Sequence, residues 1–302
     1  MPLTPQTTAL MAEITAAGGK RFHQMTVPEA RDAVTGFLDW SGPGPVMASE
    51  DIMLGVPGGS ILVRVLTPST SRGVIVYLHG GGWVFGTVDG HDAVARQLAA
   101  ATGCTVVVPE YRLAPEHPFP VPVEDCWAAL TWTADRFSQA LIVCGDSAGA
   151  NLATVLALRA RDAGGPMIAA QLLVYPVTDC DLERASFNEP DHQLILAKED
   201  MAWFWHHYIA DAGARAQSGA SPLRSPDLGR LPPACVITAE YDVLRDEGEA
   251  YAAALADAGT PAELRRFDGE THGFLVLGGK TAGAAVAMAH LSVFLDRRLQ
   301  VI

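Results

Sequence analysis

The chain has 302 residues, of which 49% are hydrophobic and 18% are charged. This composition excludes a disordered or low-complexity protein and predicts a globular chain with one large core and some additions to it. The formal net charge is −13, and no cluster of Lys or Arg opposes it. Binding to nucleic acid or to an anionic lipid surface is therefore not expected.

The sequence carries no pattern typical of export, of membrane insertion or of a metal site. Residues 1–19 lack a basic segment followed by a long apolar one, and no run of about 18 uncharged apolar residues occurs elsewhere. We therefore expect a cytoplasmic protein without stable membrane association. The five cysteines form no C-x-x-C pair, so we expect reduced thiols and no bound metal.

Short β-branched runs alternate with longer Ala-rich stretches from about residue 74 onward, which is typical of β-α-β units around a largely parallel sheet. The expected strands are residues 61–66, 74–79, 105–110, 141–145, 169–175, 234–239 and 262–267. The expected helices are residues 89–101, 123–135, 148–163, 246–258 and 282–298.

Two segments interrupt this alternation, residues 1–45 and about 181–219. Loops after parallel strands lie at the carboxyl ends of those strands, where open α/β sheets bind ligands. We therefore expect both segments to cover a binding site as a cap. The predicted organisation is an N-terminal cap segment (1–45) and a core (46–302) that contains the second cap segment as an insertion.

The motif Gly145-Asp146-Ser147-Ala148-Gly149 lies between an expected strand and an expected helix. In this context a G-x-S-x-G is typical of a nucleophile elbow, a sharp turn that exposes a reactive serine hydroxyl. The flanking glycines remove Cβ atoms that would clash in such a turn. An ordinary glycine-rich turn is the alternative, but the strand and the helix around the motif favour Ser147 as a nucleophile.

A second glycine-rich motif, His79-Gly80-Gly81-Gly82-Trp83, follows an earlier strand. Its spacing matches neither a P-loop nor a dinucleotide-binding motif, which favours an oxyanion hole over a phosphate-binding loop or a flexible turn. An oxyanion hole uses backbone N–H groups to stabilise the negative oxygen of a tetrahedral intermediate. The expected donors are Gly81, Gly82 and Ala148, and the expected supporting residues are His79, Gly80 and Asp146.

A serine nucleophile needs a base, and nine histidines compete for this role. His272 is favoured because it lies in a polar loop between the last expected strand and the last expected helix. His290 lies in an Ala-rich helix, and His206 and His207 lie in an aromatic segment. We expect a packed or surface role for His290, and a structural or pocket-lining role for His206 and His207.

Asp242 follows the expected strand at 234–239 and lies between the serine and His272, where the acid of a Ser-acid-His order belongs. Its carboxylate would orient the imidazole and stabilise its charged form. The nearby alternatives are Glu240, Asp246 and Glu247. Asp242 is favoured because it alone opens the loop after the strand.

Five blocks of the sequence together resemble the hormone-sensitive-lipase-like bacterial carboxylesterases of the α/β-hydrolase superfamily. In chain order they are HGGGW (79–83), YRLAPE (111–116), GDSAG (145–149), DVLRDEG (242–248) and HGF (272–274). Two positions depart from the family pattern, since Ala150 replaces a usual Gly and Val243 a usual Pro. Neither change removes a reacting group.

This resemblance implies an α/β-hydrolase fold, with a mostly parallel eight-stranded sheet, helices on both faces and a helical cap. It implies a serine carboxylesterase that hydrolyses short- to medium-chain esters through an acyl-enzyme intermediate, without a cofactor. The expected partner is a small ester substrate, and both a monomer and a homodimer are left open. A non-catalytic small-ligand receptor on the same fold, or an acyltransferase or amidase with the same triad, are the alternatives.

Aromatic residues near these motifs are candidates for the substrate pocket. An aromatic stripe belongs to the core more often than to a pocket, so that alternative stays open. The candidates are Trp83, Trp203, Trp205 and Tyr208.

Overall fold

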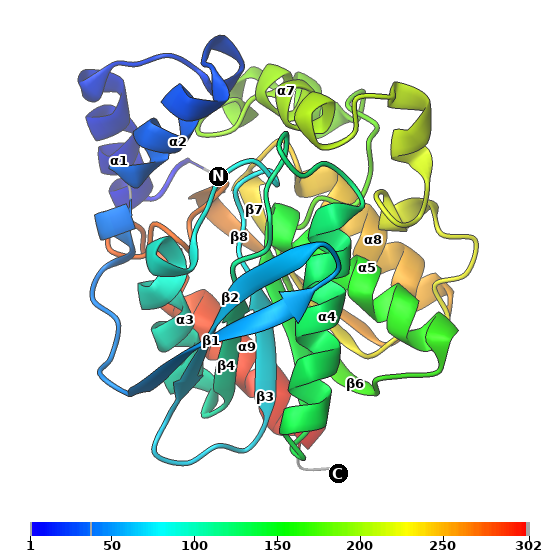
Figure 1. Cartoon of the computed structure of the whole chain (residues 1–302). Helices are drawn as coiled ribbons and strands as arrows, with labels where there is room; N and C mark the ends of the chain where they lie inside the picture. The colour runs from blue at the N-terminus through cyan, green and yellow to red at the C-terminus, as the bar shows by residue number, and fades with distance from the viewer. Residues whose placement is uncertain (1, 37, 300–302) are drawn as a thin grey trace.

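The computed structural model describes residues 2–36 and 38–299. Eight strands form one sheet in the order β1-β2-β4-β3-β5-β6-β7-β8. The pairs β1/β2 and β2/β4 are antiparallel, and all other neighbouring strands are parallel. The predicted α/β-hydrolase fold with a mostly parallel eight-stranded sheet is confirmed (Figure 1).

The bounds of the elements follow the alternation seen in the sequence. The strands are β1 (Ala48–Val56), β2 (Gly59–Thr67), β3 (Val74–Leu78), β4 (Thr105–Pro109), β5 (Leu141–Asp146), β6 (Ile168–Val174), β7 (Ala234–Tyr241) and β8 (Ala262–Thr271). The α-helices are α1 (Pro5–Ala17), α2 (Val27–Thr35), α3 (Val88–Thr102), α4 (Val121–Arg136), α5 (Ala148–Ala163), α6 (Ala185–Asn188), α7 (Lys198–Tyr208), α8 (Arg245–Asp257) and α9 (Gly283–Leu299). Among the short 3₁₀ turns, η1 (Phe22–Gln24) and η3 (Pro190–His192) lie in the segments expected to form a cap.

All seven strands named from the sequence are present, and β1 is the additional one. This strand lies at the edge of the sheet, and its residues are exposed or only partly buried. Charged residues such as Glu50 and Asp51 interrupt its apolar residues. Only Ile52, Leu54 and Val56 pack partly against the core, and the exposed Met53 between them is also apolar, so the strand shows neither a clear alternation nor a long apolar run.

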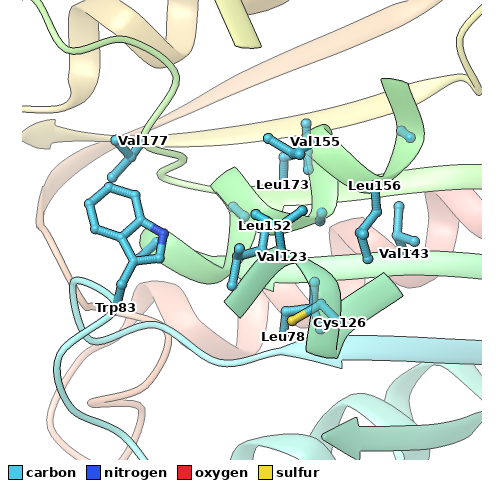
Figure 2. Close-up of a cluster of buried hydrophobic side chains, with 14 of the residues drawn as sticks. Leu78, Trp83, Val123, Cys126, Val143, Leu152, Val155, Leu156, Leu173 and Val177 are labelled. Carbon is cyan, nitrogen blue, oxygen red and sulfur yellow. The ribbon is translucent and has the colours of Figure 1, made fainter. Parts of the chain in front are cut away.

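Helices cover the sheet on both faces, and each face has its own buried cluster. One cluster joins the sheet to α4, α5 and α8, and the other joins it to α3 and α9. Figure 2 shows part of the first cluster, in which Leu152 and Val155 of α5 lie among side chains of the strands and of α4. The central strands β3 and β4 are almost entirely apolar because both of their faces are buried, whereas the edge strand β8 is partly exposed and carries charged residues.

Helices α1, α2 and α7 lie together beyond one end of the sheet (Figure 1). Side chains of the N-terminal segment bind the later segment, since Arg21 donates to the carbonyls of Gln193 (2.6 Å) and Leu194 (2.7 Å). His23 Nδ1 lies 2.7 Å from the buried carboxylate of Asp200 in α7. Two segments that are far apart in the chain are thus joined over the sheet.

Candidate active site

Ser147 lies at the sharp turn between β5 and α5. Its φ of 55° and ψ of −120° place it in a region that non-glycine residues rarely adopt. The surrounding structure stabilises this conformation, because the Ser147 N–H donates to Val174 O (2.9 Å) and the Ser147 carbonyl accepts from Asn151 N (3.1 Å). The Ser147 residue is only 7% exposed, and its surface faces a cavity.

The two glycines of the motif are required by close packing of backbone against backbone. A Cβ atom on Gly149 would lie 1.9 Å from the carbonyl oxygen of Leu78 in β3. A Cβ atom on Gly145 would lie 2.3 Å from the carbonyl carbon of Gly149. Both distances are far below any real contact, so the start of α5 can approach β3 and β5 only with glycine at these positions.

The turn after β3 also has an unusual backbone. Gly81 (φ 114°), Gly82 (φ 58°) and Trp83 (φ 61°) all have positive φ. Asp146 binds the start of this turn, because its Oδ1 accepts from Gly80 N (3.0 Å) and from the Tyr77 hydroxyl (2.7 Å). The residue before the serine therefore also fixes the turn that was expected to carry oxyanion donors.

His79 lies at the base of this turn, fully buried between two rings. It stacks on Tyr111 (4.3 Å between centroids) and on His91 (4.9 Å), and its Nδ1 lies 2.8 Å from Gly80 O. The Tyr111 hydroxyl donates to His79 O (2.7 Å). Burial, with a smaller contribution from His91, lowers the pKa of His79 to about 3. His79 is therefore neutral at physiological pH and supports the turn by packing and hydrogen bonding.

His272 lies in the loop after β8, between Ser147 and Asp242. Its Nε2 is 3.1 Å from Ser147 Oγ, and its Nδ1 is 2.8 Å from Asp242 Oδ2. Asp242 is fully buried directly after β7, and its other oxygen accepts from Leu244 N (2.9 Å). The three residues singled out in the sequence thus lie in one hydrogen-bonded row at the carboxyl ends of β5, β7 and β8.

The alternative acids have other partners. Glu240 accepts from Gly269 N (2.7 Å), and Asp246 accepts from Ser186 N (2.8 Å). Glu247 is fully buried and accepts from Thr178 N (2.6 Å), and burial raises its pKa well above the usual value. Of these carboxylates, Asp242 is the one that is hydrogen-bonded to His272.

A cavity of about 700 Å³ lies between Ser147 and the segments beyond the sheet. Ser147, His272 and the glycines of the turn after β3 line one side of it. Apolar side chains from α1, η1, the turn and α7 line the rest, among them Met11, Ile14, Phe22, Phe85, Met201 and Phe204. The site can therefore hold a mostly apolar molecule against the serine hydroxyl.

The structure corrects the prediction for the aromatic pocket. Trp83, Trp205 and Tyr208 are completely buried and pack on one another, with Trp83 stacked on Tyr208 at 4.2 Å. Figure 2 draws Trp83 inside the buried cluster. Trp203 is half-buried and packs edge-on against His207. All four lie outside the cavity lining. In α7, Met201 and Phe204 line the cavity, whereas Trp205 and Tyr208 are buried in the core.

Several residues of the site have no clear signal in the sequence. The sequence predicts Tyr77 as a strand residue, and its neighbours in the sequence do not indicate its hydrogen bond to Asp146. Phe22, Phe85 and Phe204 come from three distant segments, yet their ring centroids lie 5.1 to 5.7 Å apart. Helical spacing would place Met201 and Phe204 on one face of α7, but which face meets the cavity depends on the tertiary structure.

Two further properties of residues 2–36 and 38–299 bear on the class of protein. In this part of the chain, no three His, Cys, Asp or Glu side chains are placed to hold a metal ion together. Its helices are also too short or too polar for any of them to span a bilayer.

Comparison with known proteins places the chain in a family. The family model described as the alpha/beta hydrolase fold matches residues 75–276. The carboxylic ester hydrolase LipN of Mycobacterium tuberculosis is 39% identical over 84% of this chain and 73% of its own length. An arylesterase of Saccharolobus solfataricus is 34% identical over 91% of this chain and 93% of its own.

A solved structure agrees with these relatives over almost the whole chain. The hyperthermophilic esterase of the archaeon Pyrobaculum calidifontis superposes with a TM-score of 0.91 and is 37% identical, covering 98% of this chain and 99% of that one. The chain therefore belongs to the hormone-sensitive-lipase-like carboxylesterases of the α/β-hydrolase superfamily and is a carboxylic ester hydrolase.

Proposed function

We propose that the chain is a serine carboxylesterase in which Ser147 is the nucleophile, His272 the general base and Asp242 the residue that orients the base. The observation that carries this proposal is the row of hydrogen bonds from Asp242 through His272 to Ser147, at the wall of an apolar cavity. When Asp242 accepts a hydrogen bond from Nδ1–H, the lone pair of Nε2 faces the serine hydroxyl.

The reaction begins when His272 takes the proton of Ser147 Oγ while this oxygen attacks the carbonyl carbon of the ester. The tetrahedral intermediate then loses its alcohol, whose oxygen takes the proton from His272, and an acyl-enzyme remains. A water molecule, deprotonated by His272, attacks the acyl carbon. The second tetrahedral intermediate then releases the acid as His272 returns the proton to Ser147 Oγ. Asp242 stays ionised and stabilises the imidazolium that forms in both halves of the reaction.

The oxyanion of each intermediate would bind the backbone N–H groups of Gly81, Gly82 and Ala148. Ala148 is the first residue of α5, where N–H groups have no partner within the helix and the helix dipole favours negative charge. Gly81 and Gly82 line the same cavity as Ser147. The contacts described above let three residues support these donors, namely His79, Gly80 and Asp146. Removal of one oxyanion donor typically lowers kcat by about 10²- to 10³-fold.

We also propose that residues 1–45 and about 181–219 act as a cap that selects the substrate. The apolar lining and the volume of about 700 Å³ fit esters with short to medium acyl chains. The relatives named carboxylic ester hydrolase and arylesterase support ester hydrolysis as the reaction.

The test is hydrolysis of p-nitrophenyl esters from acetyl to long-chain acyl, with wild type beside Ser147→Ala. We expect a maximum at short to medium chains, and a loss of activity of roughly 10⁴-fold or more in the variant. A variant as active as wild type would refute the assignment of the nucleophile.

The same assay separates the other reactions that this machinery can perform. Adding an alcohol or an amine as a competing acceptor measures how the acyl-enzyme partitions between water and the acceptor. Predominant transfer to the acceptor would identify an acyltransferase, and faster cleavage of the matching anilide would identify an amidase.

A further inference from the structure

Arg31 of helix α2 reaches the turn that carries Gly81 and Gly82. Its Nε donates to the carbonyl of Val84 (2.9 Å), and its Nη2 donates to the carbonyl of Ala114 (3.1 Å). Both of these residues are completely buried. A side chain of the N-terminal segment therefore binds two main-chain carbonyls of the core, next to the active site.

Glu116 binds the remaining edge of the same guanidinium. Nη1 donates to Oε1 (2.9 Å) and Nη2 donates to Oε2 (2.7 Å), which is a bidentate ion pair. The Arg31 side chain is 32% exposed and that of Glu116 is 54% exposed, so solvent screens this pair. The bonds to the two carbonyls, and not this screened ion pair, connect the guanidinium to the turn.

The backbone conformation of this turn is strained and is stabilised by contacts with residues outside the turn. Trp83 has a φ of 61°, which costs free energy in any residue but glycine, and it follows two glycines that also have positive φ. Within the turn, Val84 N and Phe85 N both donate to Gly81 O (3.0 Å each). From outside, Ala114 N donates to Trp83 O (2.9 Å) and Arg31 donates to Val84 O, so two successive carbonyls are bound.

We propose that Arg31 is a positioning residue for ester hydrolysis, whose guanidinium fixes the turn 81–85 and so keeps the N–H groups of Gly81 and Gly82 directed at the substrate oxygen. This inference rests on the proposed function, which assigns those two donors. The role requires arginine, because its rigid planar fork donates to two carbonyls and a carboxylate at the same time, whereas lysine presents one point charge.

The experiment compares Arg31→Met, Arg31→Lys and Glu116→Gln in the full-length enzyme. We expect kcat to fall about tenfold in both Arg31 variants, which is less than the loss of a whole oxyanion donor, with KM within about twofold of wild type. Glu116→Gln keeps the bonds to both carbonyls, so its kcat should stay within about twofold of wild type.

A second measurement separates positioning from a general loss of stability. An alkylboronic acid forms a tetrahedral adduct with the serine, and one of its oxygens occupies the place of the oxyanion. Its Ki should rise in the Arg31 variants by the same factor by which kcat falls, because both report the same two donors. The control is Glu13→Gln, which breaks an exposed ion pair between α1 and Lys280 and should leave kcat and Ki unchanged.

Three outcomes would overturn the inference. The first is wild-type kcat and Ki in folded Arg31 variants, the second is a loss of kcat in Glu116→Gln as large as in Arg31→Met, and the third is a change in KM alone. If Arg31→Met does not fold, Arg31→Lys and Glu116→Gln decide the question. Ser147→Ala tests the proposed function separately, because its inactivity beside normal Arg31 variants would refute only the role of Arg31.

Discussion

On the serine side of the cavity, backbone packs directly on backbone, whereas on the cap side the wall is formed by side chains from distant segments. A Cβ atom on Gly149 would meet Leu78 O at 1.9 Å, so the start of α5 has no freedom to move against β3. On the cap side, Phe22 of η1 and Phe204 of α7 meet at 5.7 Å between ring centroids. Changes on the serine side should therefore damage the fold and the reaction, and changes on the cap side should alter which ester binds.

Gly149→Ala is expected to have the largest effect. The added methyl group must displace the main chain of β3 or α5, so we expect a loss of roughly 4 kcal/mol or more in the free energy of unfolding, together with loss of ester hydrolysis. Urea unfolding followed by circular dichroism measures the first, and the p-nitrophenyl assay measures the second.

The matched control is Gly55→Ala in the edge strand β1, where an added Cβ atom meets nothing within 4 Å. This variant should unfold at the wild-type urea concentration or slightly above it, because alanine restricts the unfolded chain. If Gly149→Ala were as stable and as active as this control, the backbone packing described for the serine side would be wrong.

A smaller effect is expected when pH is lowered. The pH dependence of stability tests whether water is excluded from the buried residues on the serine side. His79 has a pKa of about 3 in the folded chain against an ordinary value of 6.5, so the unfolded chain binds one more proton between these values. Stability should therefore fall as pH falls through this window, by up to about 1.4 kcal/mol per pH unit from this residue.

Urea unfolding of wild type and His79→Gln between pH 4 and pH 6 measures this contribution, because other titrating groups contribute equally to both proteins. The variant will be less stable overall, but its stability should depend less steeply on pH. Equal slopes for the two proteins would mean that water reaches His79 and that its pKa is close to the ordinary value.

The same contrast explains how much of the molecule can be predicted from its sequence. GDSAG and HGGGW are local motifs, because the glycines that the backbone needs are neighbours in the chain. The order of Ser147, Asp242 and His272 along parallel strands brings these three to one edge of the sheet. The alternation of apolar runs and Ala-rich stretches indicated seven of the eight strands in the same way.

Contacts between distant segments gave no such signal. The aromatic run of α7 contains both Phe204, which lines the cavity, and Trp205, which is buried in the core, and only the packing of the helix decides between them. Arg31 is one arginine among many in the sequence, and its two carbonyl partners belong to loops that follow β3 and β4. Strand β1 gives no clear signal because only its last residues are partly buried, and apolar and polar residues do not alternate there.

The smallest expected effect is on the cap side, in Phe204→Leu. The shorter side chain enlarges the cavity next to Gly82, where the ring now lies so close that a Cβ atom on this glycine would meet it at 2.2 Å. We expect the ratio of kcat/KM for a longer acyl chain to that for acetate to rise about tenfold, since one methylene in an apolar pocket is worth about 1 to 3 kcal/mol.

Trp205→Phe is the matched control for this variant, because it changes the adjacent ring of the same helix on the side that faces the core. It should lower the melting temperature, since it leaves space in a packed interior, and should leave the order of preferred acyl chains unchanged. If both variants shift the acyl preference equally, the preference depends on the position of α7 as a whole. It would then not depend on the contact of Phe204 with the acyl chain. If neither does, the acyl chain binds on another side of the cavity, where Met11 and Ile14 of α1 become the residues to vary.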